Sequence, residues 1–532
     1  MKDTATAPVP VRFRFITGGT APADVVSLIE ALEPLVEAEL DKTRALWPDG
    51  IFGNSNKKIA EGDDAHTVAP PPTPSSQTSS EDSPEDAQDS QDRQDSEDAA
   101  LGNEANNENL EVPAPPAPPT PPAPPAPTFK EVLVPTAPGV DPADARATLI
   151  SRISGHLPAR TQIVMQTSGS SIQDGHLVAL SMSAIVASAQ ASSAFLGRPG
   201  RWILALPTQH IAGLQVLVRA LIAGIPPLIV DTTRGFQPKA LARAIDRAKA
   251  KDTDTPAYLS LVPTQLSECL DAGQECVEAL KQLDAVLLGG SAATPYLLDR
   301  ARAHGIKIVT TYGMTETCGG CVYDGIPLPG VHVACVAGIV WLSGTILMEG
   351  YLEAQGDNED SPFVDMSRRR WLRTKDTGRM DGPRLIVQGR ADDVINTGGV
   401  KVHASAVESA AGAVEGVGEV CVVGLPDSRW IEVVTAVVVA SGDFEGDLVA
   451  PMYGAVEGVP AAEGIDEGGL VEPDSLAARI RTAVTAELGG AHAPRIIAIV
   501  PDLPKLGPGK IDRREVLALA QRELRAGRAW VR

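Results

Sequence analysis

Residues 284–316 read DAVLLGGSAATPYLLDRARAHGIKIVTTYGMTE and contain the pattern that decides the fold. Two apolar runs, 284–289 and 306–312, flank the amphipathic stretch Pro295–His304, which predicts a strand, a helix and a second strand. Strands that alternate with helices are joined by right-handed crossovers and form parallel sheets covered on both faces. The segment therefore predicts an α/β fold whose sheet is rich in parallel strands.

The same alternation extends from this segment toward the N-terminus. Further strands are expected at 161–166, 203–207, 227–231 and 258–263. A further helix is expected at Pro238–Lys251, where apolar residues recur at helical spacing. Ligands of such sheets bind beyond the carboxyl ends of the strands, so we expect the chemistry directly after the apolar runs.

Three stretches at these strand ends carry the side chains of ligand-binding loops. In Thr167-Ser168-Gly169-Ser170-Ser171, N–H groups and hydroxyls can cradle phosphate oxygens, although a polar turn explains this stretch equally well. In Gly289-Gly290-Ser291, the glycines permit the close approach of a flat ligand. In Thr311-Tyr312-Gly313-Met314-Thr315-Glu316, the tyrosine can stack on a base, Thr315 can bind a phosphate and Glu316 can hold Mg²⁺.

The negative charge of the chain is concentrated in one segment. The 532 residues carry 46 Lys and Arg against 68 Asp and Glu, a net charge of −22. Residues 59–129 alone hold 15 acidic residues, one basic residue and 15 of the 44 prolines. This composition predicts a disordered insertion at about 55–128, either a tolerated surface loop or a docking site for a Pro-binding domain. The acidic balance argues against a nucleic-acid partner.

Length, hydropathy and cysteine usage narrow the class further. A chain of 532 residues allows two to four domains. No stretch of about 18 uncharged apolar residues is present, so we expect no membrane span, and the first residues lack the apolar region of a secretory signal. Six cysteines in a chain of this length predict no disulfide framework, so the cytoplasm is the expected location.

Five motifs in a fixed order resemble those of the adenylate-forming superfamily, which comprises acyl-CoA synthetases, peptide-synthetase adenylation domains and luciferases. Two are the stretches that begin at Thr167 and Thr311. The others are WLRTKD at 371–376, GRADDVINTGGVKV at 389–402 and PKLGPGKIDR at 504–513. Within the superfamily the chain most resembles the actinobacterial o-succinylbenzoate–CoA ligases of menaquinone biosynthesis, on LPTQHIAGLQVLVR at 206–219 and TYGMTETCGGCVYDG at 311–325.

The resemblance implies a two-step ligase with a moving domain. ATP would activate a carboxylic acid as an acyl-adenylate with release of pyrophosphate, and CoA would then displace AMP to give a thioester. Residues 1–390 would form a large domain and residues 391–532 a small mobile α+β domain that rotates about Asp392. Its partners would be ATP, CoA and an aryl dicarboxylic acid, with Mg²⁺ as cofactor, and a homodimer is possible.

The resemblance also implies a role for each motif residue. Lys510 would be the adenylation lysine, and it would act with Thr315 and with Glu316, the Mg²⁺ ligand. The nucleotide would be bound by Thr167, Ser168, Gly169, Ser170, Ser171, Gly289, Gly290, Ser291, Thr311, Tyr312, Gly313, Asp376 and Arg390. The CoA tunnel would be lined by Gly398, Gly399 and Lys401.

Two residues are candidates for the acyl pocket. His210 and Arg219 lie nine residues apart around an expected strand-to-helix junction. The substrate that the resemblance implies, 2-succinylbenzoate, would keep one carboxylate unreacted, and a cation would recognise it. Arg219 is therefore either a clamp for that carboxylate or an exposed helix residue.

The sequence departs from the family pattern at two places. The stretch Ser171 to His176 lacks the usual lysine and glycine, and Asp174 adds a negative charge beside the expected triphosphate. Lys375 stands where the family has glycine, directly before Asp376. These changes leave two alternatives open: a CoA ligase for another aryl or acyl acid, and a degenerate non-catalytic nucleotide-binding homologue.

Overall fold

The computed structural model describes eight stretches of the chain: 11–46, 129–154, 156–167, 175–251, 254–353, 361–441, 475–507 and 510–531. They all belong to one of the two units into which the chain divides, residues 1–46 with 129–532. The predicted insertion at about 55–128 lies outside the described residues.

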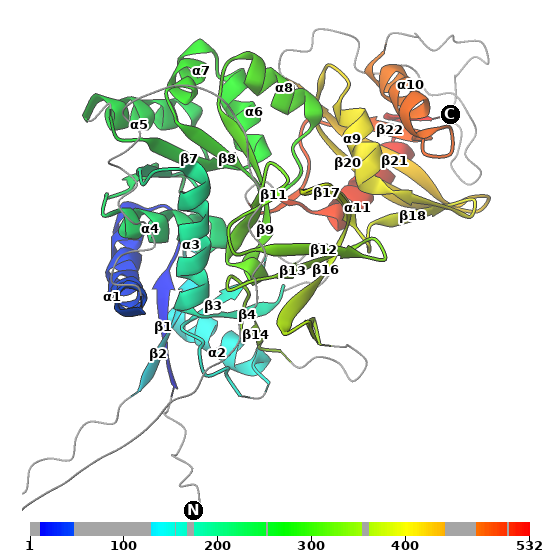
Figure 1. The fold of residues 1–532 in the computed structure, drawn as a ribbon. Coiled ribbons are helices and arrows are strands. Elements are labelled where there is room, and N and C mark those ends of the chain that lie inside the picture. Colours follow the sequence, from blue (N-terminus) through cyan, green and yellow to red (C-terminus); the bar gives the residue numbers. More distant parts are fainter. Residues whose placement is uncertain are drawn as a thin grey trace, which may run out of the picture. The chain divides into compact units, whose positions relative to one another are not determined.

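A seven-stranded sheet is the largest sheet of the described residues and confirms the predicted α/β class (Figure 1). Its strand order is β11-β10-β9-β8-β7-β5-β6, and the strands from β9 to β6 run parallel to one another. The predicted strands correspond to β5 (Arg201–Leu204), β6 (Leu228–Ile229), β7 (Ala257–Leu261), β8 (Ala285–Leu288) and β9 (Ile308–Met314). The sheet ends in two antiparallel strands, β10 (Gly319–Tyr323) and β11 (Ile326–Pro327).

Helices cover both faces of this sheet because its strands are apolar on both sides. On one face, Trp202, Leu204 and Leu287 pack in a core shared with α1 (Pro22–Leu46), α3 (Met182–Leu196) and α4 (Ile211–Ala223). The alternate residues Ile203, Leu259 and Val286 pack on the other face. Four helices share that second core: α5 (Pro238–Lys251), α6 (Pro263–Asp271), α7 (Gln274–Lys281) and α8 (Pro295–Ala303).

The strand predicted at 161–166 forms as β3 (Ile163–Gln166), but its place in the expected alternation was wrong. It lies in a separate sheet of order β1-β2-β3-β4-β14, with β1 (Val11–Thr17), β2 (Lys130–Thr136), β4 (Leu177–Leu180) and β14 (Gly350–Tyr351). The cause is the apolar run Leu177–Leu180, which returns antiparallel along β3 before any helix begins. The helix α2 (Pro142–Arg152) precedes β3. The stretch beginning at Thr167 therefore connects two strands of this second sheet.

A third sheet carries two of the predicted motifs. It pairs β12 (His332–Val336), β13 (Ile339–Ser343), β16 (Arg369–Asp381) and β15 (Phe363–Met366), and β17 (Arg384–Arg390) pairs with β16. The motif at 371–376 lies inside β16, and β17 ends at Arg390. The two motifs are thus neighbours in one antiparallel pair.

The C-terminal residues form a sheet with cores of its own. The sheet contains β18 (Val394–Thr397), β19 (Val400–His403), β20 (Val417–Asp427), β21 (Ile431–Ala440), β22 (Ile496–Ile499) and β25 (Ala529–Val531). It packs with α9 (Ala404–Gly412), α10 (Leu476–Leu488) and α11 (Arg513–Arg525) in two cores built only from residues 395–531. The other cores are built only from residues before 386. Among the helices of the described stretches, none is long and apolar enough to cross a membrane.

Candidate active site

Three predicted nucleotide-binding residues meet where β9 faces the β16–β17 pair. Asp376 of β16 lies directly opposite Arg390 of β17, with Oδ1 and Nη1 4.0 Å apart. Tyr312 of β9 donates its hydroxyl to Asp376 Oδ2 over 2.6 Å. Burial raises the pKa of Tyr312, so its phenol remains a donor at neutral pH. Burial also raises the pKa of Asp376, an effect that the Tyr312 hydrogen bond and Arg390 oppose.

The predicted glycines allow strands to pass closely at this point. A Cβ atom on Gly289 would lie 2.2 Å from Thr311 Oγ1, and one on Gly313 would lie 2.1 Å from the carbonyl oxygen of Gly319. Gly290 has a φ of +88°, in the left-handed region that favours glycine. Ser291 follows, partly exposed, at the end of β8. These glycines are therefore needed by the backbone itself, whatever ligand the loop binds.

Glu316 lies just after β9, in the short 3₁₀ helix Thr315–Thr317. Its Oε1 accepts a hydrogen bond of 2.8 Å from the hydroxyl of Tyr351 on β14, whose ring lies 4.6 Å from the ring of His176. In the described part of the chain no group of three or more His, Cys, Asp or Glu side chains forms a metal site. A single carboxylate still fits Mg²⁺, which binds through one or two carboxylates, water and substrate phosphates.

The base of the predicted phosphate loop is closed by reciprocal hydrogen bonds. Thr167 N donates to His176 O, and His176 N donates to Thr167 Oγ1, both over 2.8 Å. Gly175 has a φ of +61°, and a Cβ atom there would lie 2.0 Å from Thr167 O. The predicted residues Ser168, Gly169, Ser170 and Ser171 lie outside the described residues, as does Asp174.

Two residues that the sequence analysis missed anchor this base. Arg152, at the end of α2, donates to Gly175 O and to Glu353 Oε1, the latter over 2.5 Å. Glu353 Oε1 also accepts Leu177 N over 2.6 Å. The pair joins positions about 200 residues apart in the sequence, and no local pattern signals such a contact.

Lys510 lies at the tip of a two-stranded hairpin, β23 (Lys505–Gly507) with β24 (Lys510–Ile511). The hairpin is held by Asp512 N, which donates to Pro504 O over 2.8 Å, and by Lys505, whose ammonium lies 3.0 Å from Asp502 Oδ1. Burial and then Arg390 lower the pKa of Lys510, and the carboxylates of Glu316, Asp376 and Asp393 partly oppose this. The charges of Arg390, Glu316 and Asp376 thus act on Lys510.

The two acyl-pocket candidates lie on α4, with His210 at its N-cap. Burial and then the Lys510 ammonium lower the pKa of His210, so this imidazole is neutral at pH 7. Arg219 is only 4% exposed, so the alternative of an exposed helix residue is wrong. At 1.5 Å per residue it lies about 13 Å along the helix from His210.

The guanidinium of Arg219 has only neutral partners. Its Nη2 donates to Ser192 Oγ over 3.1 Å and to Tyr323 Oη over 3.3 Å, and Cζ lies 4.8 Å from the Trp202 ring centroid. Its Nε has no hydrogen-bond partner, and among the described residues it forms no ion pair with a carboxylate. A buried cation without a counter-ion costs free energy, and an anionic ligand would offset that cost.

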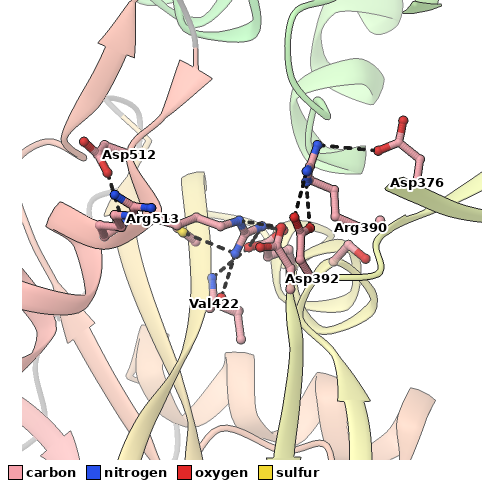
Figure 2. Close-up of polar contacts among 12 residues, drawn as sticks. Asp376, Arg390, Asp392, Val422, Asp512 and Arg513 are labelled. Carbon is pink, nitrogen blue, oxygen red and sulfur yellow. Dashed lines mark hydrogen bonds and ion pairs between the residues drawn. The ribbon is translucent and has the colours of Figure 1, made fainter. Parts of the chain in front are cut away.

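The remaining predicted residues lie in the C-terminal sheet. Gly398 and Gly399 form the exposed turn between β18 and β19, with φ values of +57° and +85°, and Lys401 follows, also exposed. Gly398 packs on Trp430, since a Cβ atom there would lie 2.7 Å from that ring. Asp392 follows β17 and holds Arg390 through two hydrogen bonds of 2.8 Å (Figure 2).

Cys318 and Cys321 are spaced like half of a zinc or redox site, but both are free and buried. Burial raises the pKa of Cys321 to about 12, so its thiol is protonated at neutral pH. The oxygen of Cys318 accepts hydrogen bonds from Ser188 and Gln215, which ties the turn after Glu316 to α3 and α4. Both cysteines therefore belong to the core that α3 and α4 share.

Comparison with known proteins gives the family. A family model described as AMP-binding enzyme matches residues 164–352, and one described as AMP-binding enzyme C-terminal domain matches residues 406–510. A probable 2-succinylbenzoate–CoA ligase of Mycobacterium tuberculosis is 38% identical over 338 residues, which are 63% of this chain and 78% of that protein. The chain belongs to the AMP-binding enzyme family.

Other relatives of this AMP-binding enzyme agree with that assignment. A 2-succinylbenzoate–CoA ligase of Listeria monocytogenes is 28% identical over 329 residues, 59% of this chain and 60% of that protein. An o-succinylbenzoate coenzyme A synthetase of Bacillus subtilis, solved with AMP, has a TM-score of 0.51 at 24% identity and covers 68% of this chain and 69% of its own. The structural likeness supports the fold, and the predicted membership of the adenylate-forming superfamily is confirmed.

The close packing of β9 against β10 can be tested by measuring the stability of glycine variants. Gly313→Ala is expected to lower the free energy of unfolding by about 1–3 kcal/mol, because the new Cβ atom would overlap Gly319 O. Gly350→Ala is the matched control, since a Cβ atom on that strand glycine would meet nothing within 4 Å beyond its chain neighbours, and it should change stability by less than about 0.5 kcal/mol. Denaturant unfolding of both variants measures the difference, and equal values would contradict the packing.

Proposed function

We propose that this enzyme is a 2-succinylbenzoate–CoA ligase of menaquinone biosynthesis. It activates 2-succinylbenzoate with ATP as an acyl-adenylate, releases pyrophosphate, and transfers the acyl group to CoA to give 2-succinylbenzoyl-CoA and AMP. The observation that carries the proposal is the contact of Tyr312 and Arg390 with Asp376, together with the charges of Arg390, Glu316 and Asp376 that act on Lys510. The 38% identity to a probable ligase of that name supports the substrate.

The first step needs positive charge on the phosphates. A carboxylate oxygen of the substrate attacks the α-phosphorus of ATP, the bond to the β-phosphate oxygen breaks, and pyrophosphate leaves. The Lys510 ammonium and the Arg390 guanidinium stabilise the negative charge that builds up on the phosphate oxygens. Glu316 would hold Mg²⁺, which supplies further positive charge to the phosphates when bound.

The nucleotide is oriented by the residues around β9. Tyr312 stacks on adenine, Asp376 accepts hydrogen bonds from the ribose hydroxyls, and Thr315 binds a phosphate. The adenine pocket is completed by Gly289, Gly290, Ser291, Thr311 and Gly313, and the phosphate loop by the stretch from Thr167 to Ser171. The reciprocal bonds between Thr167 and His176 hold the two ends of this stretch together, which supports a role as a binding loop.

In the second step the CoA thiolate attacks the acyl carbonyl and AMP leaves. We propose that residues 391–532 rotate about Asp392, which withdraws Lys510 and brings the turn of Gly398, Gly399 and Lys401 to the site. Two observations support the rotation: the hydrophobic cores separate between residues 385 and 395, and the two loops belong to different hairpins. A cytoplasmic location and a homodimer stay predictions.

The substrate assignment rests on Arg219. Its guanidinium is buried without a carboxylate partner, and the unreacted carboxylate of 2-succinylbenzoate would supply one. His210, neutral and close to Lys510, lies at the opposite end of the same helical segment and would line the pocket near the reacting group.

Product analysis tests the reaction. Incubation with ATP, Mg²⁺, CoA and 2-succinylbenzoate is expected to yield the CoA thioester and AMP, both identified by mass spectrometry. Lys510→Ala should reduce adenylate formation by about 100-fold or more, because the transition-state charge loses its cation. A thioester formed only from other aryl or acyl acids would refute the substrate, and AMP from no acid would favour a non-catalytic homologue.

Arg219 provides a separate test of specificity. Arg219→Gln should raise the KM for 2-succinylbenzoate by about tenfold or more, since a hydrogen-bonded charge contributes about 1.5–3 kcal/mol. The KM for ATP should not change. An analogue that lacks the unreactive carboxylate is the control, and an equal loss with this analogue would contradict a role in recognition.

The lowered pKa of Lys510 predicts the pH dependence of the first step. Because Lys510 acts as an ammonium ion, adenylate formation should fall as the pH rises through its pKa, which lies below the ordinary 10.5. Lys510→Arg should be slower but should keep its charge, so its activity should extend to higher pH. Exchange of pyrophosphate into ATP in the presence of the carboxylic acid substrate measures adenylate formation as a function of pH. If the activity of both proteins falls at the same high pH, Lys510 is not the cause of the fall.

A further inference from the structure

The adjacent residues Asp392 and Asp393, at the proposed hinge, each bind an arginine, and the two arginines come from different segments of the chain. Asp392 binds Arg390, which precedes it at the end of β17. Asp393 binds Arg513, with Oδ2 3.0 Å from Nε. Arg513 is the first residue of α11 and follows Lys510 by three positions.

Arg513 binds two further residues of the C-terminal part of the chain. Its Nη2 donates to both carboxylate oxygens of Glu408 on α9, over 2.7 and 2.9 Å, and its Nη1 donates to Val422 O on β20 over 2.8 Å. Glu408 in turn accepts Val422 N over 2.8 Å. Glu408 and Arg513 together therefore provide hydrogen-bond partners for both the N–H and the carbonyl group of Val422. Arg513 also binds Asp393 at the proposed hinge.

This arrangement requires a guanidinium. Only arginine offers donors in a planar fork, and here the fork serves two carboxylates and one carbonyl in different directions. The nearby acidic groups hold the pKa of Arg513 above its ordinary value, against the effect of burial. Lysine would retain the charge but could not hold all three acceptors.

The segment between Lys510 and Arg513 is short and restrained. Asp512 caps α11 by accepting the N–H groups of Arg514 and Glu515, over 3.0 and 3.2 Å. Its own N–H closes the hairpin on Pro504. A displacement of Arg513 would thus be transmitted to Lys510 through two residues whose backbone is already hydrogen-bonded.

We propose that Arg513 is a positioning residue that fixes the Lys510 hairpin to Asp393, so that the hinge and the lysine move as one body. The inference rests on the proposed function, in which residues 391–532 rotate. All described partners of Arg513 lie within the rotating residues, so its contacts can persist through the motion. The pairs of Arg390 with Asp376 and Asp392 lie at the boundary and can change.

Separate measurement of the two half-reactions distinguishes a positioning role of Arg513 from a general loss of activity. Arg513→Met is expected to lower kcat for acid-dependent pyrophosphate exchange by about 100-fold, because a shift of about 1 Å in a catalytic group costs that much. The KM for ATP should stay within about twofold, and thioester formation from preformed acyl-adenylate and CoA should change little. Arg513→Lys should recover part of the exchange activity.

Three controls keep the test decisive. Arg525→Met, at an exposed position on the same helix, should leave both half-reactions unchanged. In the Lys510→Ala background, Arg513→Met should cause no further loss of exchange, since both changes remove one function. If Arg513→Met does not fold, Arg513→Met with Glu408→Met removes both partners of the pair and still breaks the link to Asp393.

The outcomes distinguish this inference from the proposed function. An equal loss in both half-reactions, or a further loss in the Lys510→Ala background, would overturn the positioning role. Wild-type protein that catalyses neither half-reaction with any acid would instead refute the proposed function, and the inference with it. A loss of activity confined to pyrophosphate exchange, with partial recovery in Arg513→Lys, supports the proposal that Arg513 positions Lys510.

Discussion

The antiparallel pairing of β16 with β17 is the constraint on which the nucleotide corner depends. Its register sets Asp376 opposite Arg390, and Tyr312 can reach Asp376 only because β9 ends beside them. A slip of one residue would turn every side chain of β17 to the other face. The register of β16 with β17 is irregular between Thr377 and Gly378, directly after Asp376, and such an irregularity bends a strand locally.

Around this corner, positively charged side chains lie close to carboxylates. Asp376, Asp392 and Asp393 face Arg390, Arg513 and Lys510, and burial strengthens each interaction while penalising any unpaired charge. Opposing influences act on the pKa of Lys510, because burial and then Arg390 lower it and the nearby carboxylates raise it. Such a balance suits a cation that must neutralise a phosphate and then leave.

The sequence predicted the central sheet well and the side-chain partnerships poorly. Hydrophobic periodicity located the helix Pro238–Lys251 and five strands, because each buries an unbroken apolar face. It missed β4, since a short apolar run after a polar loop has no helical or alternating signature of its own. Hydrophobic periodicity could not show whether Arg219 is buried, because Trp202 and Ser192, which contact its guanidinium, are distant from it in the sequence. Tyr351 and Glu353 were missed for the same reason.

The two hinge aspartates show why neighbouring residues with one chemistry need not share one role. Asp392 binds an arginine on the large-domain side of the proposed boundary, so its pair resists rotation until it rearranges. Asp393 binds an arginine inside the rotating residues, so its pair resists deformation of that body instead. A hinge that bends at one residue and stays stiff at the next can turn a local backbone change into the displacement of a lysine located more than 100 residues later in the chain.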